Sequence, residues 1–390
     1  MEGDLIRIND WLRPLSRLYG LGTALRNVLF DIGVLKSRSF SVPVISVGNI
    51  TVGGTGKTPH VEYLISLLHD KFKVAVLSRG YKRKTRGFVM AGADATAHTV
   101  GDEPYQMHCH YPDVTVAVDK DRRRGITLLT DGSTEKDIDV VLLDDAFQHR
   151  YVKPGINILL VDYHRLIIYD TLLPAGRLRE SRKGKDRADI VIVTKCPRSL
   201  KPMDYRVITK AMNLYPYQHL YFTTLRYEPM RGLFADLSRT LDELTAADHV
   251  LLLTGIASPR QLLEDIRAHT PNVSPLTFAD HHNFRPADAD RINSSFAALP
   301  EPRMVITTEK DATRLLLLEG LSEEVRRRLY VLPVGVEFML DEEENFNHNI
   351  ISYVRKNSRN SILAKAKDDH SADNGNHSRN RSRTISFRNH

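Results

Sequence analysis

The stretch that decides the fold is VISVGNITVGGTGKT, from Val44 to Thr58. A β-branched apolar run leads into a glycine-rich turn, and Gly56-Lys57-Thr58 then opens a helical pattern. Glycines in such a turn let backbone amides approach phosphate oxygens at the N-terminal end of the helix. Lys57 would reach the outer phosphates, and the Thr58 hydroxyl would bind Mg²⁺. The predicted nucleotide-binding residues are Thr51, Val52, Gly53, Gly54, Thr55, Gly56, Lys57 and Thr58.

The match to the phosphate-loop pattern is incomplete. Thr51 stands where the strict pattern has glycine, five residues before Gly56. The GGTGKT that follows is intact, and it resembles a P-loop subclass that usually carries lysine where this chain has Val52. The alternative is an ordinary glycine-rich turn between a strand and a helix. A pair of carboxylates downstream favours nucleotide binding over this alternative.

The composition indicates a two-domain protein. The chain has 390 residues, of which 42% are hydrophobic and 26% are charged, and this length allows two domains with accessory segments. It contains no apolar run of about 18 residues that could span a bilayer. No signal-peptide pattern begins the chain, so we expect it in the cytoplasm. Cys109 and Cys196 form no C-x-x-C pair, which argues against a zinc site and a disulfide framework.

The net charge of +7 is concentrated at the C-terminal end. Residues 351–390 contain nine Lys or Arg and three Asp, so they account for +6 of the total. The rest of the chain is nearly neutral, and we therefore predict no nucleic-acid partner. Because the same segment is rich in Asn, Ser and Arg, we predict a disordered basic tail over residues 351–390. The sequence leaves the oligomeric state open.

Apolar runs alternate with helical patterns along most of the chain, which is typical of an α/β fold. Near-continuous Val, Ile and Leu runs suit parallel strands covered on both faces. The predicted strands are residues 73–78, 114–118, 139–143, 156–161 and 189–194, and in a second series 249–254, 303–307 and 330–334. The predicted domains are a P-loop NTPase-like parallel sheet core at 41–220, an extended linker at 221–233, and a second, smaller α/β domain at 234–350.

The first 40 residues form the predicted N-terminal amphipathic helical segment. Apolar residues recur there at helical spacing with arginines between them. Pro14 and the glycines Gly20 and Gly22 should divide the segment into pieces. Periodicity alone favours a helix that faces the core. Trp11 and the arginines would equally suit a helix at a membrane interface.

Three groups of acidic residues could carry chemistry. Asp144 and Asp145 follow a predicted buried strand, and a P-loop fold holds its Mg²⁺-binding carboxylate at such a strand end. Asp102 lies in the turn VGDEP, where it could cap a helix or act in catalysis. Asp280 precedes His281 and His282. A histidine beside an acid can be a base, a metal ligand or a surface pair, and the sequence does not choose between them.

Two basic loops follow strands. One begins with SRGY at 78–81 and continues through Lys82, Arg83 and Lys84, and the other is LPAGRLRE at 173–180. Such runs are usually solvated faces, and the alternative is a clamp for phosphate or an anionic acceptor. The chain has no HExxH, GxSxG or protein-kinase HRD and DFG motifs. The remaining reaction class is phosphoryl transfer from a nucleotide.

Seven sequence blocks in one order resemble the tetraacyldisaccharide 4′-kinases, the lipid A 4′-kinases of Gram-negative bacteria. The blocks are SVGNITVGGTGKTP at 46–59, SRGY at 78–81, VGDEP at 100–104, LLDDAFQHR at 142–150, LLPAGRLRE at 172–180, DHHNF at 280–284 and TEKDATRL at 308–315. The resemblance extends over residues 10–340 or so. It implies transfer of the ATP γ-phosphate, with Mg²⁺, to the 4′-hydroxyl of a tetraacylated glucosamine disaccharide 1-phosphate.

The resemblance also implies a location and a set of roles. It implies a peripheral enzyme on the cytoplasmic face of the inner membrane, with two α/β domains joined by a short two-stranded linker. A lipid acceptor makes the membrane-interface interpretation of residues 1–40 the preferred one. Asp102 matches the family's proposed catalytic base, and His281 matches the histidine that would orient it. The implied metal ligands are Thr58, Asp144, Asp145 and Glu180. The implied catalytic residues are Lys57, Asp102, Arg179 and His281.

Two rival functions remain at this point. A P-loop switch or partitioning-type ATPase is favoured by GGTGKT and disfavoured by Val52 in place of lysine. A soluble metabolite kinase with the same loop would keep the N-terminal helix in the core. The segment from Ala175 to Ser181 also departs from the proline-rich form usual in the family, which leaves the role of Arg177 open.

Overall fold

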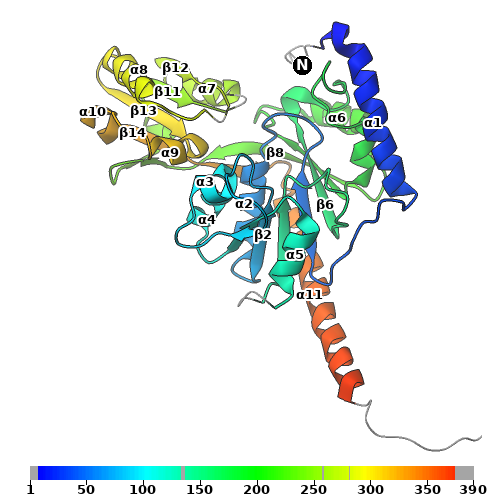
Figure 1. The fold of residues 1–390 in the computed structure, drawn as a ribbon. Coiled ribbons are helices and arrows are strands. Elements are labelled where there is room, and N and C mark those ends of the chain that lie inside the picture. The colour runs from blue at the N-terminus through cyan, green and yellow to red at the C-terminus, as the bar shows by residue number, and fades with distance from the viewer. Residues whose placement is uncertain (1–7, 133–136, 257–258, 281, 374–390) are drawn as a thin grey trace, which may run out of the picture.

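The chain folds into two α/β lobes, each built on one sheet (Figure 1). The structure is a computed structural model that describes residues 8–132, 137–256, 259–280 and 282–373. We call the larger lobe, which contains the glycine-rich loop, the core lobe. The lobe formed by residues 230–332 is the second lobe. Helix α1, Arg13–Asp31, lies along the flank of the core lobe, and helix α11, Glu343–Asp373, projects from it.

The core lobe contains a nine-stranded sheet in the order β15-β8-β7-β6-β1-β5-β2-β4-β3. Its middle strands are parallel, and β3 and β15 pair antiparallel at the two edges. Strands β1, β2, β5 and β7 are buried along their whole length, as their apolar composition predicts. The strands are β1 Val44–Gly48, β2 Val74–Ser78, β3 Val89–Met90, β4 Thr115–Val118, β5 Val140–Asp144, β6 Ile156–Asp162, β7 Ile190–Thr194, β8 His219–Tyr227 and β15 Val334–Phe338. The α/β prediction with a parallel sheet core is confirmed.

Helices cover both faces of this sheet. Successive side chains of a strand point to opposite faces, so each strand contributes to two apolar clusters. One cluster contains side chains of α2 and α11, and the clusters on the other face contain side chains of α5 and α6. The core-lobe helices are α2 Lys57–Leu68, α3 Ala97–Val100, α4 Asp102–His110, α5 Arg122–Thr130 and α6 Pro202–Met212, with short 3₁₀ turns at Asp10–Leu12, Tyr163–Arg165 and Arg182–Arg187.

The second lobe contains a six-stranded sheet in the order β10-β9-β14-β13-β11-β12. Strands β11 to β14 run parallel, and the short β9 and β10 add an antiparallel edge. The strands are β9 Met230–Gly232, β10 Ser238–Arg239, β11 His249–Thr254, β12 Val273–Thr277, β13 Arg303–Thr308 and β14 Leu329–Leu332. The helices are the 3₁₀ turn Leu241–Glu243 and α7 Arg260–Arg267, α8 Pro286–Ala297, α9 Glu309–Leu315 and α10 Glu323–Arg327.

The domain boundaries differ in detail from the predicted ones. The predicted extended linker at 221–233 consists mostly of strands that belong to the two sheets: β8 completes the core sheet and β9 belongs to the second sheet. The expected second domain at 234–350 also extends too far. After β14 the chain returns to the core lobe, where β15 pairs with β8. Two antiparallel strands therefore connect the lobes. Strand β8 leads from the core lobe toward the second lobe (Figure 1), and β15 returns the chain to the core lobe.

The prediction of disorder over residues 351–390 is wrong for residues 351–373, which continue helix α11. Phe346, Ile350 and Val354 are completely or almost completely buried in the core lobe. They recur every four residues, and this spacing places them on one face of a helix. Only Val354 of this stripe lies in the predicted tail, whose basic composition concealed the continuation of the helix. Residues 374–390 lie outside the part of the chain that the structure describes.

Helix α1 differs from two expectations. It is continuous through Gly20 and Gly22, and Pro14 lies in its first turn, where a missing amide proton costs nothing. Its apolar stripe also faces away from the core lobe, contrary to the core-facing reading that periodicity favoured. The exposed apolar residues are Trp11, Leu15, Leu18, Leu21, Leu25, Val28 and Ile32. Within the described residues, no helix is long and apolar enough to cross a membrane.

Candidate active site

The glycine-rich loop joins β1 to α2 and has the backbone geometry that its glycines predict. Gly53 and Gly56 have φ angles of +123° and +78°, which residues with a side chain rarely adopt. The loop is fixed at several points. The Val52 amide donates to the Arg177 carbonyl over 2.8 Å, and the Thr55 hydroxyl accepts from the Asn49 side chain over 2.7 Å. Arg177, whose role the sequence left open, thus supports the loop through its main chain.

A buried histidine that sequence analysis missed holds the start of α2. Burial lowers the pKa of His60 to about 4, so the ring is neutral near pH 7. With the proton on Nδ1, the ring donates to the Gly56 carbonyl over 2.7 Å, and Nε2 accepts from the Thr223 hydroxyl over 3.0 Å. The sequence contains no signal for this role, because Thr223 comes from β8, a strand 163 positions away.

The far end of the loop is held from β7. The Thr194 hydroxyl donates to the Thr55 carbonyl over 3.0 Å. The Lys195 ammonium donates to the Gly54 carbonyl and lies 2.9 Å from Asp162. A signal for both residues was present in the sequence, because Thr194 ends a predicted strand and Lys195 follows it, and the carboxyl end of that strand lies at the nucleotide edge of the sheet.

Lys57 and the two strand-end aspartates come together, as the strand order predicts. Lys57 Nζ lies 3.6 Å from Asp145 Oδ1, and Arg179 Nη1 lies 3.4 Å from Asp145 Oδ2. Burial alone would raise the pKa of Asp145, but the charges of Lys57 and Arg179 lower it below its usual value. Asp145 therefore stays ionised between two cations that could also engage phosphate oxygens.

Asp144 is buried beside Asp145 and has the opposite electrostatic environment. Its Oδ2 accepts a 2.8 Å hydrogen bond from the Ser78 hydroxyl. Burial, followed by the negative charges of Glu103 and Asp145, raises its pKa to about 7. A bound divalent cation would offset these unfavourable terms, because it favours the ionised carboxylate.

The donor set at this edge suits Mg²⁺. Asp144 and Asp145 supply carboxylates at the end of β5, the strand next to the P-loop strand β1, and Mg²⁺ prefers hard oxygen ligands. Asp145 Oδ1 is buried and makes no hydrogen bond within the described residues. Such an orphaned buried oxygen is consistent with a ligand position. Thr58 itself is partly buried at the start of α2.

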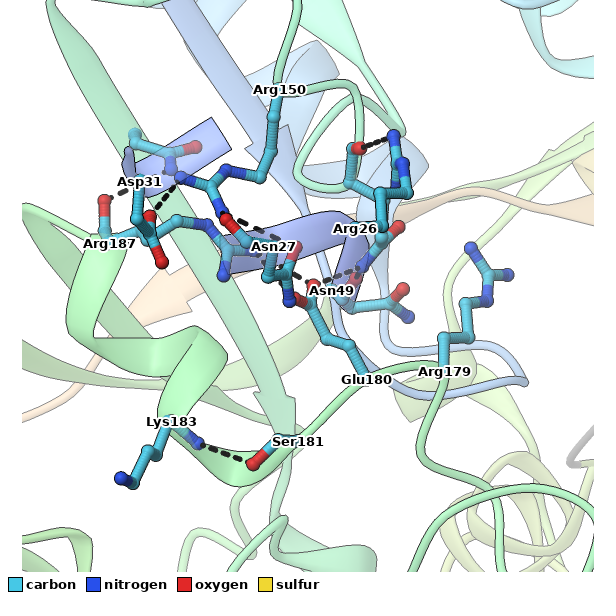
Figure 2. Close-up of polar contacts among 12 residues, drawn as sticks. Arg26, Asn27, Asp31, Asn49, Arg150, Arg179, Glu180, Ser181, Lys183 and Arg187 are labelled. Atoms are coloured by element: carbon cyan, nitrogen blue, oxygen red, sulfur yellow. Dashed lines mark hydrogen bonds and ion pairs between the residues drawn. The ribbon is translucent and has the colours of Figure 1, made fainter. Parts of the chain in front are cut away.

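Glu180, which the resemblance placed near the metal, has other partners (Figure 2). Its two carboxylate oxygens accept from one guanidinium nitrogen of Arg187 at 2.8 and 2.9 Å. The Gln148 amide lies 3.3 Å away and the Asn27 amide of α1 3.4 Å away. Glu180 thus takes part in the contact between α1 and the core lobe, and its role as a metal ligand stays a prediction.

Further polar contacts hold α1 against this region. Arg150 donates to the Asn27 carbonyl over 3.0 Å and pairs with Asp31 at 2.6 Å (Figure 2). Near the other end of α1, the Tyr19 hydroxyl donates to the Arg179 carbonyl over 2.8 Å. The residue that contacts Asp145 is thus fixed at its main chain by α1. The basic loop after β2 is structural in part, since Arg83 donates to the carbonyls of Val118 and Gly87.

The predicted base Asp102 is the first residue of α4 and lies where the second lobe meets the core lobe. Arg314 of α9 has its Nε 3.4 Å from Asp102 Oδ2. His281 lies outside the described residues, so its pairing with Asp102 stays a prediction. The neighbouring His282 contacts Asp288 instead, with 2.9 Å between Nε2 and Oδ2.

Comparisons with known proteins agree with this geometry. A family model described as tetraacyldisaccharide-1-P 4′-kinase matches residues 8–355. The chain is 57% identical over 363 residues to the tetraacyldisaccharide 4′-kinase of Phocaeicola vulgatus, covering 93% of this chain and 99% of that protein. It is 55% identical over 376 residues to the one from Bacteroides fragilis, covering 95% and 100%. The crystal structure of LpxK from Aquifex aeolicus in complex with ATP matches with a TM-score of 0.64 and 29% identity, covering 89% of this chain and 99% of that chain.

Proposed function

Because the chain belongs to the tetraacyldisaccharide-1-P 4′-kinase family, matched over residues 8–355, we propose that it transfers the γ-phosphate of ATP to the 4′-hydroxyl of tetraacyldisaccharide 1-phosphate in lipid A biosynthesis. The observation that carries this proposal is the P-loop with the strand-end carboxylate pair, in which Lys57 lies 3.6 Å from Asp145. This arrangement is one that nucleotide-dependent phosphoryl transfer requires.

The P-loop would bind the phosphates of ATP through its amides and the N-terminal end of α2. Lys57 and Arg179, which now share Asp145, would turn to the transferring phosphoryl group and stabilise its charge. Thr58, Asp144 and Asp145 would hold Mg²⁺. When bound, this ion supplies charge neutralisation at the phosphate oxygens.

Asp102 would accept the proton of the 4′-hydroxyl as that oxygen attacks phosphorus. A free aspartate has a pKa of about 3.9 and is a weak base at neutral pH. A histidine at position 281 could orient the carboxylate or take up the proton, which is the physical case for a pair. Asp102 belongs to the core lobe and position 281 to the second lobe, so the lobes would have to approach each other to complete the site.

We also propose that the enzyme binds the cytoplasmic face of the inner membrane through α1. The support is the stripe of exposed apolar side chains, five of them in α1 with Trp11 just before it and Ile32 just after it, since an acylated acceptor has to be reached in a lipid surface. The opposite face of α1 contacts the Arg179 and Glu180 region. One face of α1 would therefore contact the membrane while its other face contacts the region of the phosphate site.

ATP turnover measured with and without the acylated disaccharide 1-phosphate tests the proposal. We expect turnover that depends on this acceptor and a product phosphorylated at the 4′ position. ATP hydrolysis that ignores the acceptor would favour a switch or partitioning-type ATPase. Equal rates with a deacylated, water-soluble acceptor would favour a soluble metabolite kinase. The Lys57→Ala variant serves as the control for activity from other enzymes in the preparation.

A further inference from the structure

The second lobe contacts the Asp102 helix through a line of charged pairs. Residues of helix α9 in the second lobe pair with residues of helix α4 in the core lobe. The pairs are Glu309 with His110 at 3.3 Å, Lys310 with Glu103 at 4.0 Å, and Arg314 with Asp102 at 3.4 Å. The line ends at the residue proposed as the base.

Arg314 is the least exposed of the three α9 residues. Its side chain is 8% exposed, compared with 12% for Glu309 and 21% for Lys310. Exposed ion pairs are screened and contribute little. A charge that is largely removed from water depends more on its partner than an exposed charge does. Of the three pairs, the one with Asp102 therefore contains the most buried cation.

Arg314 is itself fixed from within the second lobe. Its Nη1 lies 3.4 Å from Oδ1 of the completely buried Asp311, and Nη1 donates to the His282 carbonyl over 3.1 Å. The Asp311 carboxylate in turn accepts from the Gly255 amide and the Thr308 hydroxyl, both over 2.8 Å. The guanidinium is thus anchored to the ends of two strands of the second lobe, β11 and β13.

Two donors of Arg314 still have hydrogen-bonding capacity. Within the described residues, Nε and Nη2 are buried and make no hydrogen bond, although Nε is at ion-pair distance from Asp102. Hydrogen bonds in a catalytic site often tighten only when substrate is bound. A small movement of α9 toward α4 would convert the ion pair into one or two hydrogen bonds.

We infer that Arg314 is a positioning residue for Asp102, through which the second lobe fixes the base for attack on the phosphoryl group. The inference rests on the proposed function, in which Asp102 accepts the acceptor's proton. Arg314 itself acts through Asp102 and does not contact the reacting atoms. Its polar contacts among the described residues are with Asp102, Asp311 and the His282 carbonyl, so we expect nucleotide binding not to depend on it.

The test compares Arg314→Gln, Arg314→Lys and the matched control Arg328→Gln. Among the described residues, the ion pairs of Arg328 are with Glu301 and Glu324, both in the second lobe. We expect Arg314→Gln to lower kcat about 100-fold, the loss typical of a misplaced catalytic group, with an unchanged KM for ATP. Arg314→Lys should lose less, because it keeps the charge but not the planar fork of donors. Arg328→Gln should match the wild type.

The Asp102→Asn background provides the second readout. If Arg314 acts only through Asp102, adding Arg314→Gln to Asp102→Asn should lower kcat little further. Fully multiplicative losses, or a rise in the KM for ATP as large as the loss in kcat, would overturn the inference. If Arg314→Gln does not fold, the test uses Arg314→Lys instead. A wild-type kcat in Arg314→Lys would overturn the inference. High activity of Asp102→Asn alone would refute the proposed base, whereas an inactive Asp102→Asn with a fully active Arg314→Gln would refute only the role of Arg314.

Discussion

Replacing leucines on the outer face of α1 should detach the enzyme from lipid surfaces without affecting its nucleotide site. Leu18 and Leu25 are 67% and 59% exposed, and each lies in the stripe that runs along the helix away from the core lobe. Complete burial of such a side chain contributes about 1.5–3 kcal/mol. The exposed share of each leucine would then contribute about 1–2 kcal/mol on entering an apolar phase. The double change to serine should therefore weaken partitioning by about 2–4 kcal/mol, or roughly 30- to 700-fold.

The assay is co-sedimentation with vesicles of phosphatidylethanolamine and phosphatidylglycerol, combined with kinetics on the acylated acceptor. A matched control is the pair Leu316→Ser and Leu317→Ser in the second lobe, whose leucines are 52% and 70% exposed. We expect the α1 double variant to lose vesicle binding and catalytic efficiency toward the acylated acceptor, with an unchanged KM for ATP. Equal losses in the control pair, or normal vesicle binding of the α1 variant, would refute the membrane-contact role of this face.

Three further predictions concern the P-loop, the C-terminal helix and the contact between the lobes. Lys57→Ala should fold normally but lose several powers of ten in kcat, since it removes a charge used at the transition state; turnover close to wild type would exclude the loop from the mechanism. A chain ending at Glu342 lacks three fully buried apolar side chains that contribute about 5–9 kcal/mol, which is comparable with the whole stability of many domains. It should not fold, whereas a chain ending at Ser358 should give the circular-dichroism melting curve of the full protein. The hydrogen bond to Glu62 raises the pKa of His110 above its usual 6.5, so its stabilising effect is complete below pH 6.5 and is lost as pH rises through the raised pKa. The melting temperature should therefore fall with rising pH more steeply in the wild type than in His110→Gln, and parallel curves would contradict this.

The nucleotide site could be predicted because its determinants are local or follow from strand order. Positive φ angles at Gly53 and Gly56 reflect residue type alone. The aspartates come to the loop because β5 is parallel to β1 and adjacent to it, and parallel strands present their carboxyl ends at the same edge. The distance of 3.6 Å between Lys57 and Asp145 follows from these two facts.

Glu180 shows where this reasoning ends. The resemblance placed it close to the metal, and the structure does bring the neighbouring Arg179 to Asp145. The side chain of Glu180 instead pairs with Arg187 and meets Gln148 and Asn27. Asn27 comes from a helix 153 positions earlier in the chain. Sequence order gives the type of side chain at a position but not which of several distant donors reaches it first.

Helix α1 could be predicted as amphipathic, but the orientation of its two faces could not. Several of the polar contacts of its inner face are to main-chain atoms, with Ser16 donating to the Leu172 carbonyl over 3.0 Å and accepting from the Ala175 amide over 2.9 Å. Bonds of this kind leave no mark in residue periodicity, because the partner can be any residue type. Packing the apolar stripe against the core lobe would have removed it from water. In the structure the stripe faces away from the core lobe and is exposed. An outer face of this kind is favourable only where the surroundings are less polar than water, so the orientation of α1 supports a lipid surface in a way that its periodicity alone does not.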